Sequence, residues 1–168
     1  MKILYIARLF SGLEHSVLSR RWSPSGVPTI YKLIDLLDSK VESLYVVLTK
    51  KSGQHSAWVS SKDELISCVG LKSKIQVIAG PEYFPVWLGR VRSKLSELRQ
   101  LLCIIFLVHR ISPDIIYIDH SNIWAAGILS RLTSRCVILR LMGVYPTMRQ
   151  ALEGGRVAHI IQRWCYKA

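Results

Sequence analysis

The residues best suited to chemistry follow predicted strands. His120 comes directly after the apolar run 114–119, where an imidazole could bind a sugar hydroxyl or a phosphate, or serve only in the structure. Asp119 beside it could simply cap the helix that follows. Gly12 and Gly26 lie in the polar stretch 8–26, and Gly26 begins a predicted helix whose backbone N–H groups could hold an anion. Both glycines could equally serve only to shape the backbone.

Several common chemistries have no pattern in this sequence. No closely spaced glycines open a helix after the first strand, and no loop ends in Gly-Lys-Ser/Thr, which argues against a dinucleotide or a P-loop site. No Ser-His-Asp order, Cys-His pair or paired carboxylates stand out. The cysteines stand about thirty residues apart, without the close pairs of zinc or redox motifs, and we expect reduced core residues: Cys68, Cys103, Cys136 and Cys165.

The charge of the chain calls for a polyanionic neighbour. Its 168 residues hold 23 Lys+Arg and 11 Asp+Glu, a formal net charge of +12. Nucleic acid, anionic lipid or a phosphorylated substrate would fit, although a basic surface can also serve solubility alone. Nucleic acid is disfavoured because no recognition motif is present. Arg20 and Arg21 lie in the polar stretch after the first strand and are candidate contacts for a substrate.

The elements that position these residues alternate between strands and helices. Apolar runs predict strands over 2–7, 44–49, 75–78, 114–119 and 137–141. Helical spacing predicts helices over 28–37, 87–105, 122–132 and 147–166, and a short one over 62–68, whereas 8–25 and 50–61 read as loops. This alternation predicts an α/β fold, a Rossmann-like doubly wound parallel sheet in a single domain over 1–168. Ligands would bind beyond the carboxyl ends of the strands, at 8–26, 49 onward, 119–121 and 141–143.

The segment 87–110 combines an apolar stripe with basic side chains. One interpretation is an amphipathic helix that lies on an anionic membrane, with contacts from Trp87, Arg90, Arg92 and Lys94. The other is an ordinary crossover helix, packed on the sheet by its apolar side. No apolar run approaches the roughly 20 residues that a spanning helix needs.

Four short motifs occur in an order and spacing found together in one known family. They are Lys2-Ile3-Leu4-Tyr5-Ile6, Ser25-Gly26-Val27-Pro28, the run 113–120, and Leu139-Arg140-Leu141-Met142-Gly143. With these motifs the chain resembles the N-terminal half of a glycosyltransferase of the two-domain GT-B architecture and the family-four type. The resemblance extends over nearly the whole chain.

The resemblance implies transfer of a sugar from a nucleotide-sugar, with retention at the anomeric carbon, to a glycan or lipid-linked acceptor. It places Gly12 or Gly26 near the donor diphosphate and His120 near the transferred sugar. Gly143 belongs to the substrate-binding set, although Met142 stands where many relatives have histidine. The nucleotide-sugar would be a co-substrate, and no metal or other cofactor is implied.

The family's second, donor-binding domain has no counterpart in this sequence. We therefore expect the acceptor-binding half of the enzyme, inactive alone, with a separate donor-binding domain or a second copy as partner. Its expected place is the cytoplasm, peripheral on the inner face of the membrane, in cell-surface polysaccharide or glycolipid synthesis. The alternative is a non-catalytic binding or interaction module derived from the same fold.

Overall fold

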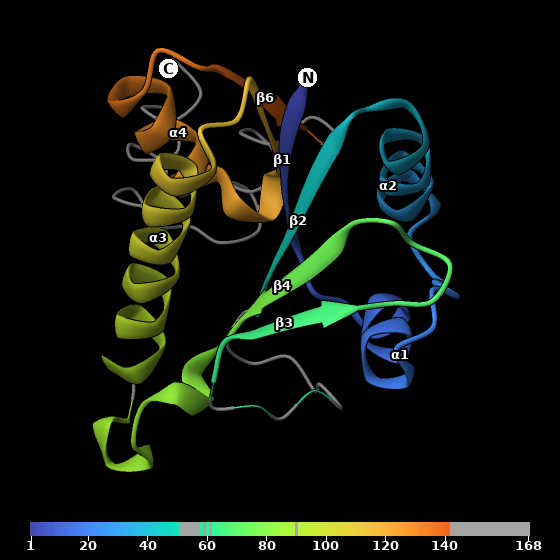
Figure 1. The fold of residues 1–168 in the computed structure, drawn as a ribbon. Coiled ribbons are helices and arrows are strands. Elements are labelled where there is room, and N and C mark those ends of the chain that lie inside the picture. Colours follow the sequence, from blue (N-terminus) through green and yellow to red (C-terminus); the bar gives the residue numbers. More distant parts are fainter. Residues whose placement is uncertain (51–57, 59, 61, 90, 142–168) are drawn as a thin grey trace.

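The fold is a mostly parallel sheet between two layers of helices (Figure 1). The computed structural model describes residues 1–50, 58, 60, 62–89 and 91–141. Within these residues, six strands follow the order β3-β4-β2-β1-β5-β6, and only β3 runs antiparallel to its neighbour. The strands are β1 (Lys2–Arg8), β2 (Ser43–Thr49), β3 (Glu64–Ser67), β4 (Lys74–Ile78), β5 (Ile115–Asp119) and β6 (Cys136–Arg140).

The described helices connect these strands. The α-helices are α1 (Ser11–Ser19), α2 (Pro28–Lys40), α3 (Val91–Ile111) and α4 (Ile123–Leu132), and the short 3₁₀ helices are η1 (Pro81–Tyr83), η2 (Val86–Leu88) and η3 (His120–Asn122). The sequence prediction of an α/β, Rossmann-like doubly wound fold is confirmed. The helix predicted over 147–166 lies outside the described residues.

β1 is a central strand of the sheet, and its side chains take part in both hydrophobic cores. Leu4 and Ile6 point to the core beneath α3 and α4, whereas Tyr5 points to the core beneath α1 and α2. All three side chains are fully buried. A central parallel strand is covered on both faces, which explains why its sequence is a continuous apolar run instead of an alternating one.

Two predictions made between the strands are wrong. The stretch 8–25 is not one long loop, because α1 occupies much of it and buries Leu13 and Val17, four residues apart. The polar residues around them mask this helical spacing. The segment 62–68 is not a helix but contains β3, in which Ile66 alone turns its side chain into the core. That alternation is the period of a strand with one exposed face.

The long helix α3 is in place, but part of the apolar side that was expected to pack on the sheet faces outward. Leu98 and Leu102, which belong to the apolar stripe of the segment 87–110, are more than half exposed. The side that packs inward carries polar residues in its first half and apolar ones in its second: Ser96, Gln100, Ile104, Leu107 and Val108. Gln100 explains this orientation, because its amide donates to two backbone carbonyl oxygens of the strand ends. A hydrogen-bonded amide can be buried without the large cost of an unpaired one.

Candidate functional site

The carboxyl edge of the sheet opens where the strand order reverses. β1 lies between β2 and β5, and the chain passes from one side of β1 to the other after β4. Helices therefore leave the ends of β1 and β5 toward opposite faces, and a crevice forms outside that point in folds of this kind. Thr49 and Asn122 meet there, with 2.9 Å between the Thr49 hydroxyl, which donates, and Asn122 Oδ1.

A buried polar cluster lies at the ends of β1, β5 and β6. Asp119 and Arg140 are register partners on neighbouring strands, with 3.6 Å between Oδ1 and Nη1. Their side chains are 6% and 14% exposed. Tyr5, one strand away, is fully buried, and its hydroxyl has no hydrogen-bond partner among the described residues, as is true of Asp119 Oδ1 and Arg140 Nη1. The cluster thus has unused hydrogen-bonding capacity.

The cluster changes the acidity of Tyr5. Burial raises the pKa of the phenol above its ordinary value of 10.0, and the nearby Asp119 carboxylate raises it further, while Arg140 acts against them. The phenol therefore stays protonated at neutral pH. It can donate a hydrogen bond there without adding charge.

Arg140 connects this cluster to the first turn of α2. Its Nη2 atom donates to the Thr29 hydroxyl at 2.5 Å. α2 begins with Pro28, and no side chain caps its N-terminus. The first turn of a helix presents backbone N–H groups and the positive end of the helix dipole. Arg140 places a guanidinium beside it that is ion-paired with Asp119 but has an Nη1 atom without a hydrogen-bond partner among the described residues. An anion bound here would meet both the helix terminus and this donor.

Gly12 and Gly26 each meet a requirement of the backbone. A Cβ atom on Gly12 would lie 1.8 Å from the carbonyl oxygen of Ser25, so no other residue fits there without displacing the loop. Gly26 has φ +88°, in the left-handed region that favours glycine. The Phe10 ring lies near both. The two glycines are therefore neighbours in space, and together they hold the loop that leads into α2.

His120 is placed at the carboxyl edge, as its position after β5 predicts. It begins η3 and is buried, at 7% exposed. Arg20 and Arg21 are not brought to it. They are exposed and flank a backbone pairing with Val69, in the turn that precedes the amino end of β4. Gly143 lies outside the described residues.

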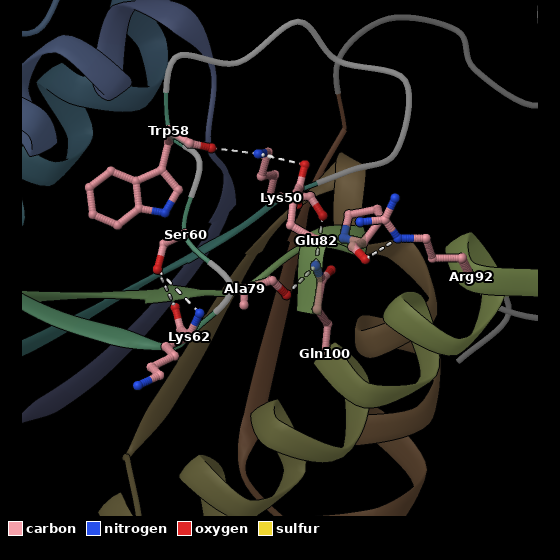
Figure 2. Close-up of polar contacts among 9 residues, drawn as sticks. Lys50, Trp58, Ser60, Lys62, Ala79, Glu82, Arg92 and Gln100 are labelled. Carbon is pink, nitrogen blue, oxygen red and sulfur yellow. Dashed lines mark hydrogen bonds and ion pairs between the residues drawn. The ribbon is translucent and has the colours of Figure 1, made fainter. Parts of the chain in front are cut away.

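A second buried cluster, around Lys50, went unnoticed in the sequence. Lys50 directly follows β2, and its side chain is 3% exposed. Its ammonium group lies 2.8 Å from Glu82 Oε1 and donates to the Trp58 carbonyl oxygen at 2.5 Å (Figure 2). Gln100 of α3 donates to the Lys50 carbonyl oxygen at 2.6 Å. We call these four residues the Lys50 cluster; the one signal for it in the sequence is the position of Lys50 directly after a predicted strand.

The residues expected to contact a membrane differ in their exposure and their contacts. Trp87 belongs to η2 and is 81% exposed. Arg92 is half-buried in α3 and donates to the Pro81 carbonyl oxygen at 2.5 Å (Figure 2). Lys94 is exposed and lies 3.3 Å from Glu97. Arg90 lies outside the described residues.

Two negative findings apply to the described residues. They contain no group of three or more His, Cys, Asp or Glu side chains placed to hold a metal ion. Among them, too, no helix combines the length and the hydropathy needed to cross a bilayer.

Of the four cysteines, Cys68, Cys103 and Cys136 are free thiols. Burial raises the pKa of the Cys68 and Cys103 thiols, which keeps them protonated and unreactive.

The fold and the site define an α/β protein with a Rossmann-like sheet and an arginine, Arg140, at its carboxyl edge beside the first turn of α2. Comparison with protein-family models, with curated proteins and with solved structures finds no match to this chain.

Proposed function

We propose that this chain is the acceptor-binding half of a retaining glycosyltransferase that uses a nucleotide-sugar. The observation that carries the proposal is the pairing of Arg140 with the first turn of α2, beside the point where the strand order reverses. A diphosphate, whether of a nucleotide-sugar or of a lipid-linked acceptor, is the ligand chemistry that such a place favours. The resemblance of the four motifs supplies the reaction class.

In this proposal Asp119 and Tyr5 position Arg140, while Thr29 and His120 contact the ligand. Asp119 holds the guanidinium from the sheet side, and Tyr5 lies beneath the pair. Thr29, which is exposed at the start of α2, shares the ligand's side of the guanidinium. His120, at the end of β5, would contact a sugar ring. Transfer itself would require a donor-binding domain in addition to these residues, so the isolated chain should bind without turning over.

The test is a thermal-unfolding titration of the chain with UDP-sugars and GDP-sugars, with and without the acceptor presented in anionic vesicles. A ligand that binds only the folded state raises stability by about 2.7 kcal/mol at a hundredfold excess over its Kd. We expect a rise that Arg140→Gln abolishes. Arg135→Gln, at the opposite end of β6, is the matched control and should keep the rise. An equal loss in both variants would contradict the proposed site.

The same titration distinguishes the glycosyltransferase from the alternative function, a non-catalytic binding or interaction module. A binding or interaction module would respond to a glycan or a diphosphate with no preference for a nucleotide-sugar. It would also remain without transfer activity after a donor-binding domain is added. Appearance of sugar transfer in the mixture, lost in Arg140→Gln, would support the glycosyltransferase.

A further inference from the structure

Three buried polar atoms near the start of α2 lack a hydrogen-bond partner among the described residues. They are the Tyr5 hydroxyl oxygen, Asp119 Oδ1 and Arg140 Nη1. The strand register brings them together on one face of the sheet. Asp119 is the register partner of Arg140, while Tyr5 is the partner of Tyr117, which lies two residues before Asp119 on the same side of β5. Buried polar groups are nearly always hydrogen-bonded, so three such atoms in one cluster call for an explanation.

The charges of this cluster balance each other. Asp119 Oδ1 lies 3.6 Å from Arg140 Nη1, so a negative and a positive group share the site. A phosphate oxygen that approaches Nη1 also approaches the carboxylate, and like charges repel. Net charge therefore does not determine which ligand fits here, and the pattern of hydrogen-bond donors and acceptors becomes decisive.

The three atoms differ in the hydrogen bonds that they can make. Arg140 Nη1 can only donate, and the Asp119 carboxylate can only accept. Ser121 donates to Asp119 Oδ2 at 3.3 Å, which leaves Oδ1 for another donor. The Tyr5 phenol is protonated at neutral pH and can donate. A phosphate oxygen satisfies Nη1 but not Oδ1, whereas a hydroxyl group can donate to Oδ1 and accept from Tyr5.

The spacing of the two charged atoms restricts where the ligand carries that hydroxyl. Because Oδ1 and Nη1 are 3.6 Å apart, the two ligand oxygens that meet them are neighbours as well. A hydroxyl on the carbon next to the phosphorylated carbon meets this requirement. Arg140 is the most exposed of the three residues, with 14% of its side chain exposed, and it bonds to Thr29 of α2. A ligand that replaces Thr29 at the guanidinium enters from the side of α2.

We propose that Asp119 and Tyr5 select a phosphate ester that carries a free hydroxyl on the carbon beside the phosphorylated one. The phosphate accepts from Arg140 at the first turn of α2, and the hydroxyl donates to Asp119 Oδ1. This inference rests on the proposed function for the place of the phosphate, and it adds the residues that determine specificity. An ester without the hydroxyl leaves a buried acceptor unpaired, which is the situation in which binding sites discriminate most strongly.

The experiment is calorimetric titration of the full chain at pH 8 with three phosphate monoesters. Glucose 1-phosphate carries the hydroxyl, 2-deoxyglucose 1-phosphate lacks only that hydroxyl, and methyl phosphate has no hydroxyl at all. At this pH the phosphate of each ester has lost its second proton, whose pKa is about 6, and cannot replace the hydroxyl as a donor. We expect glucose 1-phosphate to bind about tenfold or more tightly than either of the other two.

Two variants test the assignment to residues. Asp119→Asn removes the negative charge at nearly constant size, so methyl phosphate should bind more tightly while the preference for glucose 1-phosphate falls below about threefold. A merely structural role of Asp119 would instead weaken the binding of all three esters. Tyr5→Phe should reduce the preference without strengthening methyl phosphate. The matched control is Tyr117→Phe, which changes the ring stacked on Tyr5 at 5.4 Å between centroids and should leave the preference unchanged. Circular dichroism and thermal unfolding verify that each variant is folded.

The outcomes separate this inference from the proposed function. If both glucose phosphates bind equally and Arg140→Gln abolishes the binding of both, the hydroxyl is not recognised and the inference is overturned, while the phosphate site stands. Binding of UDP-sugars without binding of glucose 1-phosphate would also overturn the inference alone. If neither class of ligand binds, both proposals fail. Equal effects of Tyr5→Phe and Tyr117→Phe would contradict the role given to Tyr5.

Discussion

Lys50 and Arg140 both stand at carboxyl ends of strands, and both are mostly withdrawn from water. The Lys50 ammonium has a carboxylate at 2.8 Å and a carbonyl oxygen at 2.5 Å. The Arg140 guanidinium has its carboxylate at 3.6 Å and one bond to the exposed Thr29. The first cation has two close acceptors from the protein, whereas Nη1 of the second has no hydrogen-bond partner among the described residues.

This difference separates structural from functional polar residues. Removing a charge from water is costly, and close partners must compensate for it. The Lys50 ammonium has such close partners, although Glu82 Oε2 in the same cluster is buried without a hydrogen-bond partner among the described residues. The cluster joins β2, η1 and α3 through Glu82 and Gln100. The cluster of Tyr5, Asp119 and Arg140 is less fully compensated, which is the arrangement expected where a ligand completes the bonding. Four predictions can sharpen or break this comparison, from the largest expected effect to the smallest.

Lys50→Met should cost the most stability. It leaves Glu82 without its partner and the Trp58 carbonyl oxygen without its donor. Breaking a buried pair from one side typically costs about 3–5 kcal/mol. Because Glu82 is 32% exposed and can be partly hydrated, we expect a loss of about 3 kcal/mol. Urea unfolding measures it, with the exposed Lys74→Met as the control. A loss below about 1 kcal/mol would show that the Lys50 cluster is not structural.

Thr49→Val should cost about 1–1.5 kcal/mol in the same urea assay. The two side chains have nearly the same volume, so the change removes the hydroxyl that donates to Asn122 Oδ1 and leaves that buried acceptor unpaired. Ser39→Ala, at an exposed hydroxyl in α2, is a control that should change stability by less than about 0.5 kcal/mol. Equal effects in both variants would contradict the importance of the Thr49–Asn122 bond.

Tyr5→Phe should raise stability by about 1 kcal/mol, opposite in sign to the two changes above. It removes a buried hydroxyl that has no hydrogen-bond partner among the described residues, while the ring keeps its stacking on Tyr117 at 5.4 Å between centroids. The gain in stability should come with weaker binding of the ligand at Arg140. A clear loss of stability would mean that the hydroxyl is fully bonded in solution.

The pH dependence of that same variant gives the smallest signal. The Tyr5 phenol has a raised pKa in the folded chain, so folding favours its protonated form. The associated stability is complete below the ordinary value of 10.0 and is lost as the pH rises above it. Wild-type protein should therefore lose more stability than Tyr5→Phe between about pH 9.5 and about pH 11, as followed by chemical unfolding. Parallel losses would contradict the raised pKa.

The sheet could be predicted from the sequence because its strands are buried on both faces. The runs at 2–7 and 114–119 contain almost nothing but apolar residues, and a short run of that composition is typical of a strand covered on both sides. The outward side of α3 could not be predicted in this way. Periodicity identifies an apolar side of a helix, but Gln100 bonded to the Lys50 and Ala79 carbonyl oxygens determined which side packs inward.

The candidate site was predictable only in part. The rule for parallel strands located His120 and Gly26 at the carboxyl edge, whereas Arg20 and Arg21 lie elsewhere. Arg140 was overlooked as a binding residue because it reads as the end of an apolar strand. Its partner Asp119 is 21 residues away in sequence, and Thr29 is 111 residues away. The contacts of Arg140 with Asp119 and Thr29 depend on the order of the strands in the sheet, and a local sequence pattern carries no information about that order.

The pairing of β1 with β5 has a consequence while the chain is being synthesised on the ribosome. Lys2 donates from its backbone to the Asp114 carboxylate at 2.8 Å, and Asp114 donates back to the Lys2 carbonyl oxygen at 2.9 Å, across 112 residues. The central strand leaves the ribosome before the other described strands, yet one of its neighbours is made more than a hundred residues later. At a synthesis rate of roughly 5–20 residues per second, β1 exposes an apolar edge for seconds. The side of β1 that pairs with β5 therefore stays without its partner strand until the residues after Asp114 have been made.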